Sequence, residues 1–228
     1  MIRENAIAGP GAPERRRASR LEKSERRAIL LQAALAVFAR RGIGGAHHAE
    51  IARKAKVSVP TVFFYFPTRN ALVDAVLEEV ARFFTEMAER IYAERRPAPE
   101  TILKHMHAFT DAVDTHPHHT RVMLEWSTAL RHEVWPAFLQ FQERVIAMLA
   151  QAIRRWRIET GSDLDREAED DARVIAAAGY VLVQMKVAKL PDARIERFMH
   201  AVLRDSLGDG QAPASVQPRL PMFKVAIG

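Results

Sequence analysis

Five of the nine histidines fall within one stretch of the chain, between His105 and His119. The segment THPHHT brings His116, His118 and His119 together, and three imidazoles could bind a zinc ion. Pro117 disrupts the helical i, i+4 spacing that would point two imidazoles at one metal, and no carboxylate follows at ligand spacing. We therefore predict a polar connection between helices and no metal site, with a histidine-based metalloprotein as the less favoured alternative.

The sequence motifs of nucleophilic catalysis, nucleotide binding by a P-loop and zinc-dependent hydrolysis are absent from this sequence. The chain contains no G-x-S-x-G elbow, no P-loop and no H-E-x-x-H zinc motif. It contains no cysteine, which removes thiolate nucleophiles and disulfides and fits a reducing cytoplasm. The sequence contains no run of about 18 apolar residues, the length that would be needed to span a membrane. We expect a cytoplasmic protein that is not an enzyme, needs no cofactor and has no membrane partner.

Positive charge is concentrated at the start of the chain. Residues 1–70 hold 14 Lys and Arg against 5 Asp and Glu, a net charge of +9. The remaining residues hold 20 against 23, a net charge of −3. A basic front on a mildly acidic body favours a polyanionic partner for the front alone.

The basic front contains an acid-free segment, KVSVPTVFFYFPTRNAL, at residues 56–72. Ser58 is a favourable N-cap, and Pro60 falls in the first turn of the following helix, where a missing N–H costs little. Pro67 ends that helix, and Thr68 can cap the next one. The segment therefore predicts a short aromatic helix between two capping signals.

A second short helix precedes this one, and the two are spaced as a helix-turn-helix. We predict helices at 48–55 and 59–65, joined by a turn at 56–58. In such a motif the second helix reads the major groove of DNA. The basic front and this spacing together indicate a DNA-binding unit.

Helical patterns continue through the rest of the chain, and no segment shows sustained period-2 alternation. We predict an all-α protein whose further helices lie at about 69–95, 98–114, 118–130, 133–157, 166–188 and 192–207. The chain divides into a mobile basic arm at 1–20, a three-helix helix-turn-helix domain at 21–68, a helical body at 69–207 and a loose tail at 208–228.

The segment HAEIARKAKVSVPTVFFYFPTRNALVDAV resembles the helix-turn-helix pattern of the TetR family. Within that family the chain looks most similar to the quorum-sensing master regulators of the LuxR/HapR/SmcR type, through FARRGIGGAHHAEIA and, far downstream, EWSTALRHEVWP. The resemblance implies a TetR-like fold and a sequence-specific regulator that binds double-stranded operator DNA, a pseudo-palindrome, as a dimer. Control by a ligand or by abundance is expected. A nonspecific architectural DNA-binding protein is the alternative.

The resemblance and the capping pattern together suggest which residues contact DNA. Ser58 would offer the first N–H groups of the reading helix to a phosphate, and Thr61 suits a phosphate or a thymine methyl. Tyr65, Thr68 and Arg69 are placed to hold the adjacent phosphate. The complete predicted set is Arg20, His47, His48, Ser58, Val59, Pro60, Thr61, Phe64, Tyr65, Thr68 and Arg69.

The aromatic residues of the reading helix divide between core and surface. Val62, Phe63 and Phe66 are expected in the core of the small domain. Phe64 can either pack on sugar and base edges or join that core, and the sequence leaves both open.

Two basic features flank the reading helix. One of His47 and His48 is expected to contact a phosphate, the alternative being capping and packing in the turn. Arg20 ends the arm, and the resemblance implies that such an arm enters a narrow, A·T-rich minor groove. A solubilising tail is the alternative for the arginines further out.

The chain departs from the family pattern at three positions. Most members have Gly where this chain has Lys56, which predicts a positive φ at a residue with a Cβ. The subgroup has Ala in place of Pro60 and Asn in place of Phe64. The operator sequence is therefore not carried over by the resemblance.

The body would be a ligand-binding and dimerisation domain. The homodimer is expected to form through helices 166–188 and 192–207 as a four-helix interface across a two-fold axis, with intramolecular core as the alternative role for part of their apolar residues. The resemblance implies a cavity for a small apolar ligand, which would be lined by Phe84, Phe109, Met123, Trp126, Phe138, Gln142 and Ile146. The alternative is that this aromatic and methionine stripe is plain core.

Overall fold

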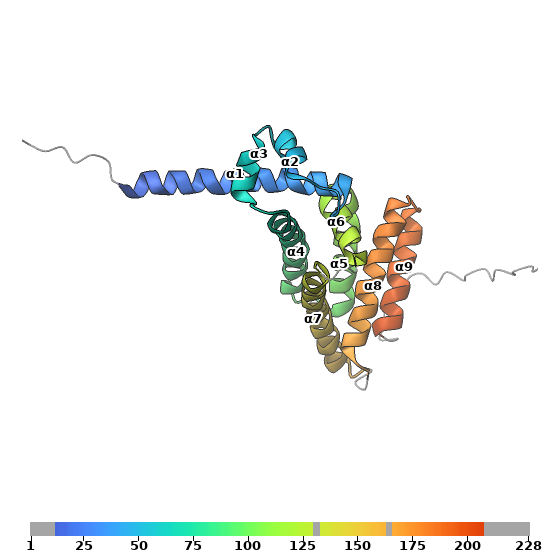
Figure 1. The fold of residues 1–228 in the computed structure, drawn as a ribbon. Helices are drawn as coiled ribbons and strands as arrows, with labels where there is room; N and C mark the ends of the chain where they lie inside the picture. Colours follow the sequence, from blue (N-terminus) through green and yellow to red (C-terminus); the bar gives the residue numbers. More distant parts are fainter. Residues whose placement is uncertain (1–11, 130–132, 163–165, 208–228) are drawn as a thin grey trace, which may run out of the picture.

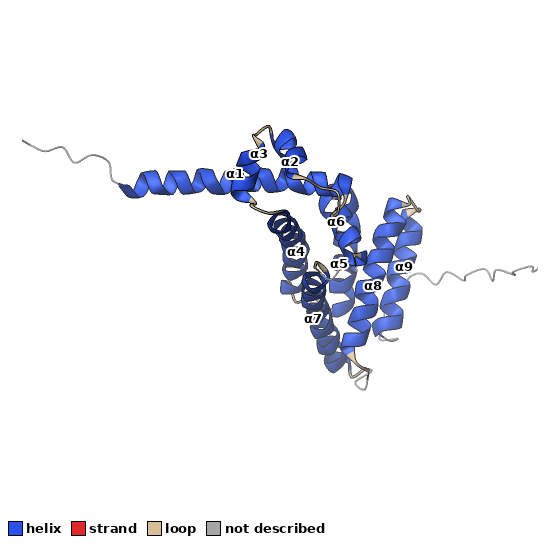
Figure 2. Cartoon of the chain, in the orientation of Figure 1, coloured by secondary structure: helices blue, strands red, loops and turns tan. Residues whose placement is uncertain are grey.

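The computed structural model describes residues 12–129, 133–162 and 166–207, with side chains from residue 22 onward. These residues form nine helices and contain no strand (Figures 1 and 2). The helices are α1 (Ala12–Arg41), α2 (His48–Ala55), α3 (Val59–Tyr65), α4 (Arg69–Ala93), α5 (Ala98–Thr115), α6 (Pro117–Thr128), α7 (Trp135–Thr160), α8 (Ala168–Val187) and α9 (Asp192–Leu207). Among the described helices, none is long and apolar enough to cross a membrane.

Helix α1 is longer than the sequence pattern predicted. It begins at Ala12, so residues 12–20 of the predicted arm are helical. Their sequence, APERRRASR, consists largely of good helix formers but has no apolar face, and periodicity therefore missed it. Residues 1–11 and the predicted tail at 208–228 lie outside the described residues.

Helices α1 to α3 form a small unit, here called the head. The apolar stripe of α1, with Leu30, Ala34 and Phe38, is fully buried against Ile51 of α2 and Val62 of α3. The turn between α2 and α3 places Lys56 at φ 56° and ψ 46°, as predicted from the missing glycine. The head therefore holds α3 on its outer side with a fixed turn before it.

Helix α4 joins the head to the remaining helices, α5 to α9, and together α4 to α9 are called the body. Thr68 caps α4 as predicted, because its Oγ1 accepts the N–H of Ala71 at 3.0 Å. In Figure 1, α4 descends from the head, while α5 to α9 form a bundle beside and below it. Helix α6 packs against α1, and α8 lies in contact with α5, α7 and α9.

One hydrophobic core runs from the head into the body. It begins at Leu30 of α1, continues along α4 and reaches Trp126 of α6 and Phe141 of α7. A second core, from Ala98 to Leu207, joins α5, α7, α8 and α9. The head is thus packed directly on the helices that form the upper part of the body.

A buried charged cluster fixes the far ends of the body helices. Arg157 of α7 forms an ion pair with Asp171 of α8 and donates hydrogen bonds to the carbonyls of Arg166 and Ser206. Asp171 also pairs with Arg166. Because a buried charge is costly without partners, this cluster holds α7 and α8 in one relative position. Both helices line the cavity described below.

Candidate DNA-reading helix and ligand cavity

The reading helix α3 presents a polar start and an exposed outer face. The Ser58 hydroxyl accepts the N–H of Thr61 at 3.3 Å and lies 2.8 Å from the Thr61 hydroxyl. Val59 and Pro60 are exposed in the first turn, while Val62 is fully buried. The inward side of α3 is therefore core, and its N-terminal turn is open to a partner.

Phe64 is a surface residue, which resolves the alternative that the sequence left open. Its side chain is 67% exposed and its ring meets Tyr65 edge-on. Phe66, two positions on, is only 1% exposed and belongs to the core as predicted. The large exposed aromatic on α3 is unusual in a soluble protein, because burying such a ring would stabilise the fold.

Phe63 was predicted in the core, and this was wrong. Its ring is 46% exposed and stacks on the imidazole of His48, with 4.1 Å between the ring centroids. His48 is itself buried, and its Nε2 donates to the carbonyl of Phe66 at 2.8 Å. His48 thus fixes α2 against α3 from inside, whereas the neighbouring His47 is exposed.

Arg69 has a structural task that the sequence did not indicate. Its Nη2 donates to the carbonyls of Ile43 at 2.8 Å and Gly44 at 2.9 Å, in the loop between α1 and α2. The expected phosphate contact therefore competes with this loop for the same guanidinium. Thr68 next to it is exposed, and Tyr65 is half-buried.

Helix α1 contributes two cations beside α3 that sequence reasoning missed. Lys23 Nζ lies 5.1 Å from the centre of the Phe64 ring, and Arg27 Cζ lies 5.3 Å from that of Phe66. Arg20 is one helical turn before Lys23 on α1, and its side chain is outside the described residues. The i, i+4 spacing of Lys23 and Arg27 on a predicted helix was the signal that could have found them.

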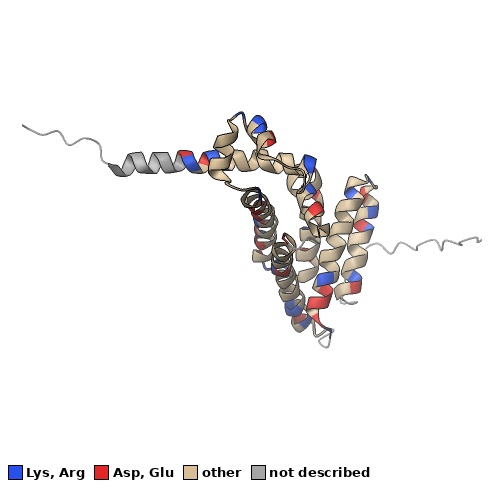
Figure 3. Cartoon of the chain, viewed as in Figure 1, with Lys and Arg blue, Asp and Glu red and all other residues tan. Residues whose placement is uncertain are grey.

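Charge is arranged around α3 rather than on it. Helix α3 carries no ionisable acid or cation, and the charged residues of the head lie on α1, α2 and the connecting loops (Figure 3). The one acid of α2, Glu50, meets Arg41 at 2.9 Å, Arg40 at 3.5 Å and Arg53 at 3.6 Å. The hydrogen bond from Arg41 lowers the pKa of Glu50. Glu50 therefore stays ionised and ties α1 to α2.

The loop between α1 and α2 is also bound by the body. Glu125 of α6 accepts the N–H of Ile43 through Oε1 at 2.8 Å. Gly42 lies at φ 80°, and a Cβ there would stand 2.8 Å from the same carboxylate oxygen. A residue with a side chain at position 42 would thus meet both backbone strain and Glu125.

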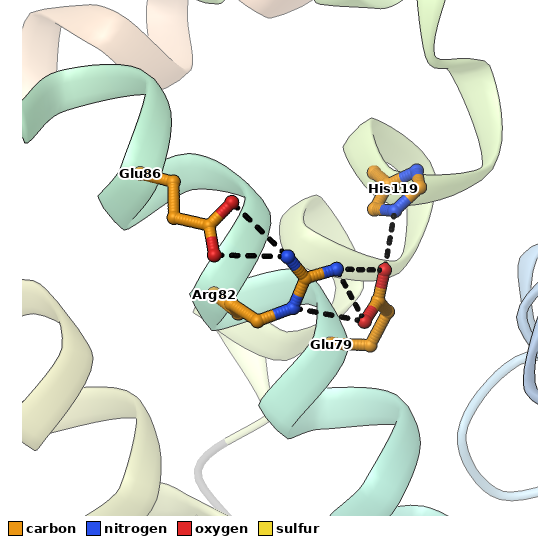
Figure 4. A network of polar contacts seen from close by, with 4 residues as sticks. All are labelled: Glu79, Arg82, Glu86 and His119. Carbon is orange, nitrogen blue, oxygen red and sulfur yellow. Dashed lines mark hydrogen bonds and ion pairs between the residues drawn. The ribbon is translucent and has the colours of Figure 1, made fainter. Parts of the chain in front are cut away.

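A polar network joins α4 to α6 below the head (Figure 4). Arg82 binds Glu79 and Glu86, and Nε2 of His119 points at Glu79 Oε1 from 3.7 Å. Burial lowers the pKa of His119, and the Glu79 carboxylate opposes that shift. The rings of His116 and His119 contact Phe83.

The histidine stretch was predicted as a connection between helices, and the structure corrects this in part. Pro117 opens α6, so His118 and His119 are helical and His116 alone lies between α5 and α6. Within the described part of the chain, no group of three His, Cys, Asp or Glu side chains could hold a metal.

The body contains a cavity of about 60 Å³ between five of its helices. Four of the seven predicted residues line it: Phe84, Phe109, Met123 and Gln142. The other lining residues are His105, Met106, Phe141, Val145, Leu149, Ile175, Ala176, Gly179 and Tyr180. Helix α8 thus forms one wall, although the sequence analysis had named no cavity residue on it.

Three predicted cavity residues, Trp126, Phe138 and Ile146, do not line it and are buried core instead. The Trp126 indole donates through Nε1 to the carbonyl of Val134 at 2.9 Å. Its ring packs on Phe138 and lies flat over Phe141. Helical spacing placed these residues near the cavity, but only tertiary packing decides which one faces it.

His105 and Tyr180 are polar residues of the cavity that the pattern did not reveal. The Nδ1 of His105 lies 3.3 Å from the hydroxyl of Tyr92 on α4. Burial lowers the pKa of His105 to about 4, so its imidazole is neutral at pH 7. Burial also raises the pKa of Tyr180 to about 12.

Helix α8 has a second apolar face that no described residue covers. Val174 is 53% exposed and Val181 40% exposed, with Ala177 between them. Ala178 and Leu182, on the same helix, are buried inside the body. The predicted interface residues therefore divide between intramolecular core and an exposed stripe.

A helix-turn-helix head with a capped, outward-facing reading helix, carried on an all-helical body with an internal cavity, defines a DNA-binding transcriptional regulator. The comparisons with known proteins agree. Residues 30–76 match the family of bacterial regulatory proteins, tetR family. Over 187 residues the chain is 38% identical to the HTH-type transcriptional regulator LuxR of Vibrio harveyi, covering 81% of this chain and 90% of that protein. The chain belongs to the TetR family.

Solved structures show the same fold at low sequence identity. The TetR family regulator CifR, complexed with 26bp double-strand operator DNA, matches with a TM-score of 0.67 and 19% identity, over 78% of this chain and 94% of that chain. FadR from Bacillus subtilis, in complex with stearoyl-CoA, matches with a TM-score of 0.66 and 17% identity, over 79% of this chain and 97% of that chain. The protein is a transcriptional regulator of this family and not an enzyme.

Proposed function

We propose that this regulator binds a pseudo-palindromic operator as a homodimer at the bacterial nucleoid, and that a small apolar ligand in the body cavity controls this binding. The observation that carries the proposal is the exposed face of α3. Its N-terminal turn is capped by Ser58 and open to a phosphate, and it contains no acid. The division into a DNA-binding domain at 21–68 and a body at 69–207 is part of the proposal.

The proposed DNA contacts follow from exposure. Val59, Pro60, Thr61 and Phe64 would meet base edges and sugars in the major groove. Ser58, Tyr65, Thr68 and His47 would hold phosphates on either side, and Lys23 and Arg20 would extend this contact along α1. His48 is left out because it is buried, and Arg69 is given the task of positioning the loop.

The exposed stripe of α8 supports the dimer. Val174, Ala177 and Val181 repeat at helical spacing on the face away from the cavity. An exposed apolar stripe on one helix is typical of an interface, and an isologous contact through it would pair α8 and α9 with their copies.

Two helices connect the cavity to the head and support control by a ligand. Helix α4 starts beside the reading helix and carries Phe84 to the cavity. Helix α6 lines the cavity with Met123 and, two residues on, holds the head loop with Glu125. A ligand that moves either helix would change the spacing of the two reading helices, and such coupling acts equally in both directions.

The test is to map the DNA that the full-length protein binds across the genome and to footprint the strongest site. We expect two half-sites about 34–36 Å apart, and binding far tighter than to random DNA of equal length. A footprint of one asymmetric half-site would contradict the dimer. Equal affinity for random DNA would favour a nonspecific architectural protein, whose binding depends on salt but does not discriminate between DNA sequences.

A further inference from the structure

We infer that the cavity takes a compact, uncharged ligand with a hydrogen-bond acceptor, such as a short-chain ketone or ester, and that His105 and Gln142 select it. This inference rests on the proposed sensory function of the cavity and names the class of ligand. Three observations carry it: the charge of the walls, the free polar groups and the size.

The walls exclude a charged ligand. Phe84, Phe109 and Phe141 contribute aromatic surface from three helices, and the remaining contacts are mostly aliphatic. Among the described residues that line the cavity there is no Asp, Glu, Lys or Arg. A carboxylate or an ammonium group would lose its hydration there without meeting an opposite charge.

We assign the His105 proton to Nε2 through its contact with Tyr92. Burial raises the pKa of Tyr92, so its phenol keeps its proton and can donate it. With Nδ1 of His105 accepting from that hydroxyl, the imidazole hydrogen lies on Nε2. Within the described chain Nε2 has no hydrogen-bond partner, and His105 lines the cavity. In this tautomer, an N–H of a residue that lines the cavity has no protein partner and can donate to a ligand.

Two further polar groups converge from other helices. Gln142 of α7 and Tyr180 of α8 line the cavity, and neither side chain forms a hydrogen bond to another described residue. A few placed polar groups in an otherwise apolar wall are the usual means of orienting a small ligand. Here the donors of His105 and Gln142 match a carbonyl or ester oxygen.

The volume limits the ligand to a compact molecule. A water molecule needs roughly 10–15 Å³ of such space, so the cavity of about 60 Å³ accepts several non-hydrogen atoms. A larger ligand would have to move a wall. Since Phe84 and Met123 stand on the two helices that reach the head, wall movement is the step that would transmit binding.

The experiment compares three probes of equal size on the full-length protein at about pH 8, where His105 is neutral. The probes are methyl propyl ketone, the alkene that has C=CH2 in place of its C=O, and butyrate. Binding is followed by saturation-transfer NMR and by the shift in melting temperature. We expect the ketone to bind about fivefold tighter than the alkene, the value of one hydrogen bond, and butyrate at least about tenfold weaker than the ketone.

Variants assign the preference to the two side chains. Gln142→Leu keeps the size of the side chain and removes its amide, and His105→Phe removes the N–H donor. Each should reduce the preference for the ketone over the alkene and leave alkene binding unchanged. Gln184→Leu, on the exposed side of α8, is the matched control and should behave as wild type. If His105→Phe does not fold because Tyr92 loses its partner, Gln142→Leu carries the test.

The possible failures are distinguishable. Equal binding of ketone and alkene, tight binding of butyrate, or no binding of any probe would overturn the inference about ligand class. Met123→Trp, which fills the cavity, should abolish binding of the probes while operator binding persists. If the wild-type protein does not bind its operator in the absence of any probe, that result would instead count against the proposed function.

Discussion

The Oε1 atom of Glu125 accepts a hydrogen bond from the backbone N–H of Ile43 at 2.8 Å, across 82 residues of sequence. The acceptor belongs to a body helix that lines the cavity, and the donor belongs to the head. Arg69 binds the carbonyl of the same residue from the start of α4. Both polar groups of the Ile43 backbone are therefore held by helices that reach the cavity.

Replacing Glu125 by Ala should weaken both stability and operator binding. The partly buried N–H of Ile43 would lose its partner, which costs about 1–3 kcal/mol. Urea unfolding and operator titration measure the two effects. Glu125→Gln keeps an acceptor and should lose less, whereas Glu143→Ala, which removes an exposed ion pair with Arg173, should change little. If Glu125→Ala is as stable as the wild type, the hydrogen bond between Ile43 and Glu125 does not contribute to stability.

Lys56→Gly should stabilise the protein. Lys56 has a φ of 56°, where a Cβ costs roughly 1–2 kcal/mol, and glycine removes that cost while losing part of it as chain entropy. We expect a net gain of about 1 kcal/mol in the free energy of unfolding by urea. Lys54→Gly is the matched control, because Lys54 is helical and the same change there should cost about 1 kcal/mol. A loss in both variants would refute the strain argument.

Alanine substitutions at Phe64 and Phe66 should affect DNA recognition and folding stability separately. Phe64→Ala is expected to leave the melting temperature nearly unchanged and to alter which operator sequences bind, because its ring is exposed on the reading helix. Phe66→Ala should instead cost about 3–5 kcal/mol of stability, since it empties a core position. Binding selection from a random DNA library measures specificity, and calorimetry measures stability. An unchanged sequence preference in Phe64→Ala would remove this ring from the DNA interface.

Stability should fall with acid through His105. Its pKa is about 4 in the folded protein against an ordinary value of 6.5, so the unfolded chain binds a proton that the folded chain refuses. Stability is therefore full above pH 6.5 and declines as the pH falls from 6.5 towards about 4, by up to about 3 kcal/mol. Urea unfolding at about pH 7.5 and pH 5 should show a drop of about 2 kcal/mol that is absent from His105→Phe and His105→Gln. The same drop in these variants would assign it to other groups.

The dimer should depend on the exposed face of α8. The double variant Val174→Lys, Val181→Lys would place two positive charges in the proposed interface. We expect this variant to be a monomer by analytical ultracentrifugation and to lose operator binding. Ile158→Lys is the matched control, because Ile158 is even more exposed but lies on α7. A double variant that sediments like wild type would place the interface elsewhere.

Local signals in the sequence predicted most of the fold. Ser58 and Thr68 cap α3 and α4 because capping depends on a few neighbouring residues, which a sequence shows directly. The positive φ of Lys56 was predicted from the resemblance instead, because most members of the family have Gly at this position.

Features that depend on distant parts of the chain could not be predicted. The contact of Arg69 with Ile43 and Gly44 joins segments about 25 residues apart, and no local pattern marks it. Phe63 looked like core because it is aromatic, yet His48 covers one face of the ring and leaves the other open. Trp126 and Met123 share one helix and one apolar side, and only the packing of α7 separates core from cavity.

The core shared by α1, α4 and α6 bears on how such regulators can diversify. A head joined to the body only by a linker could be exchanged between relatives as a module. Here a transplanted head would meet a foreign α6, and its loop would lose Glu125 unless the new body supplied an acid at the same place. Changes in the DNA-reading part must therefore be inherited together with changes in the sensing part, and chimaeras of this protein have to be cut inside the body.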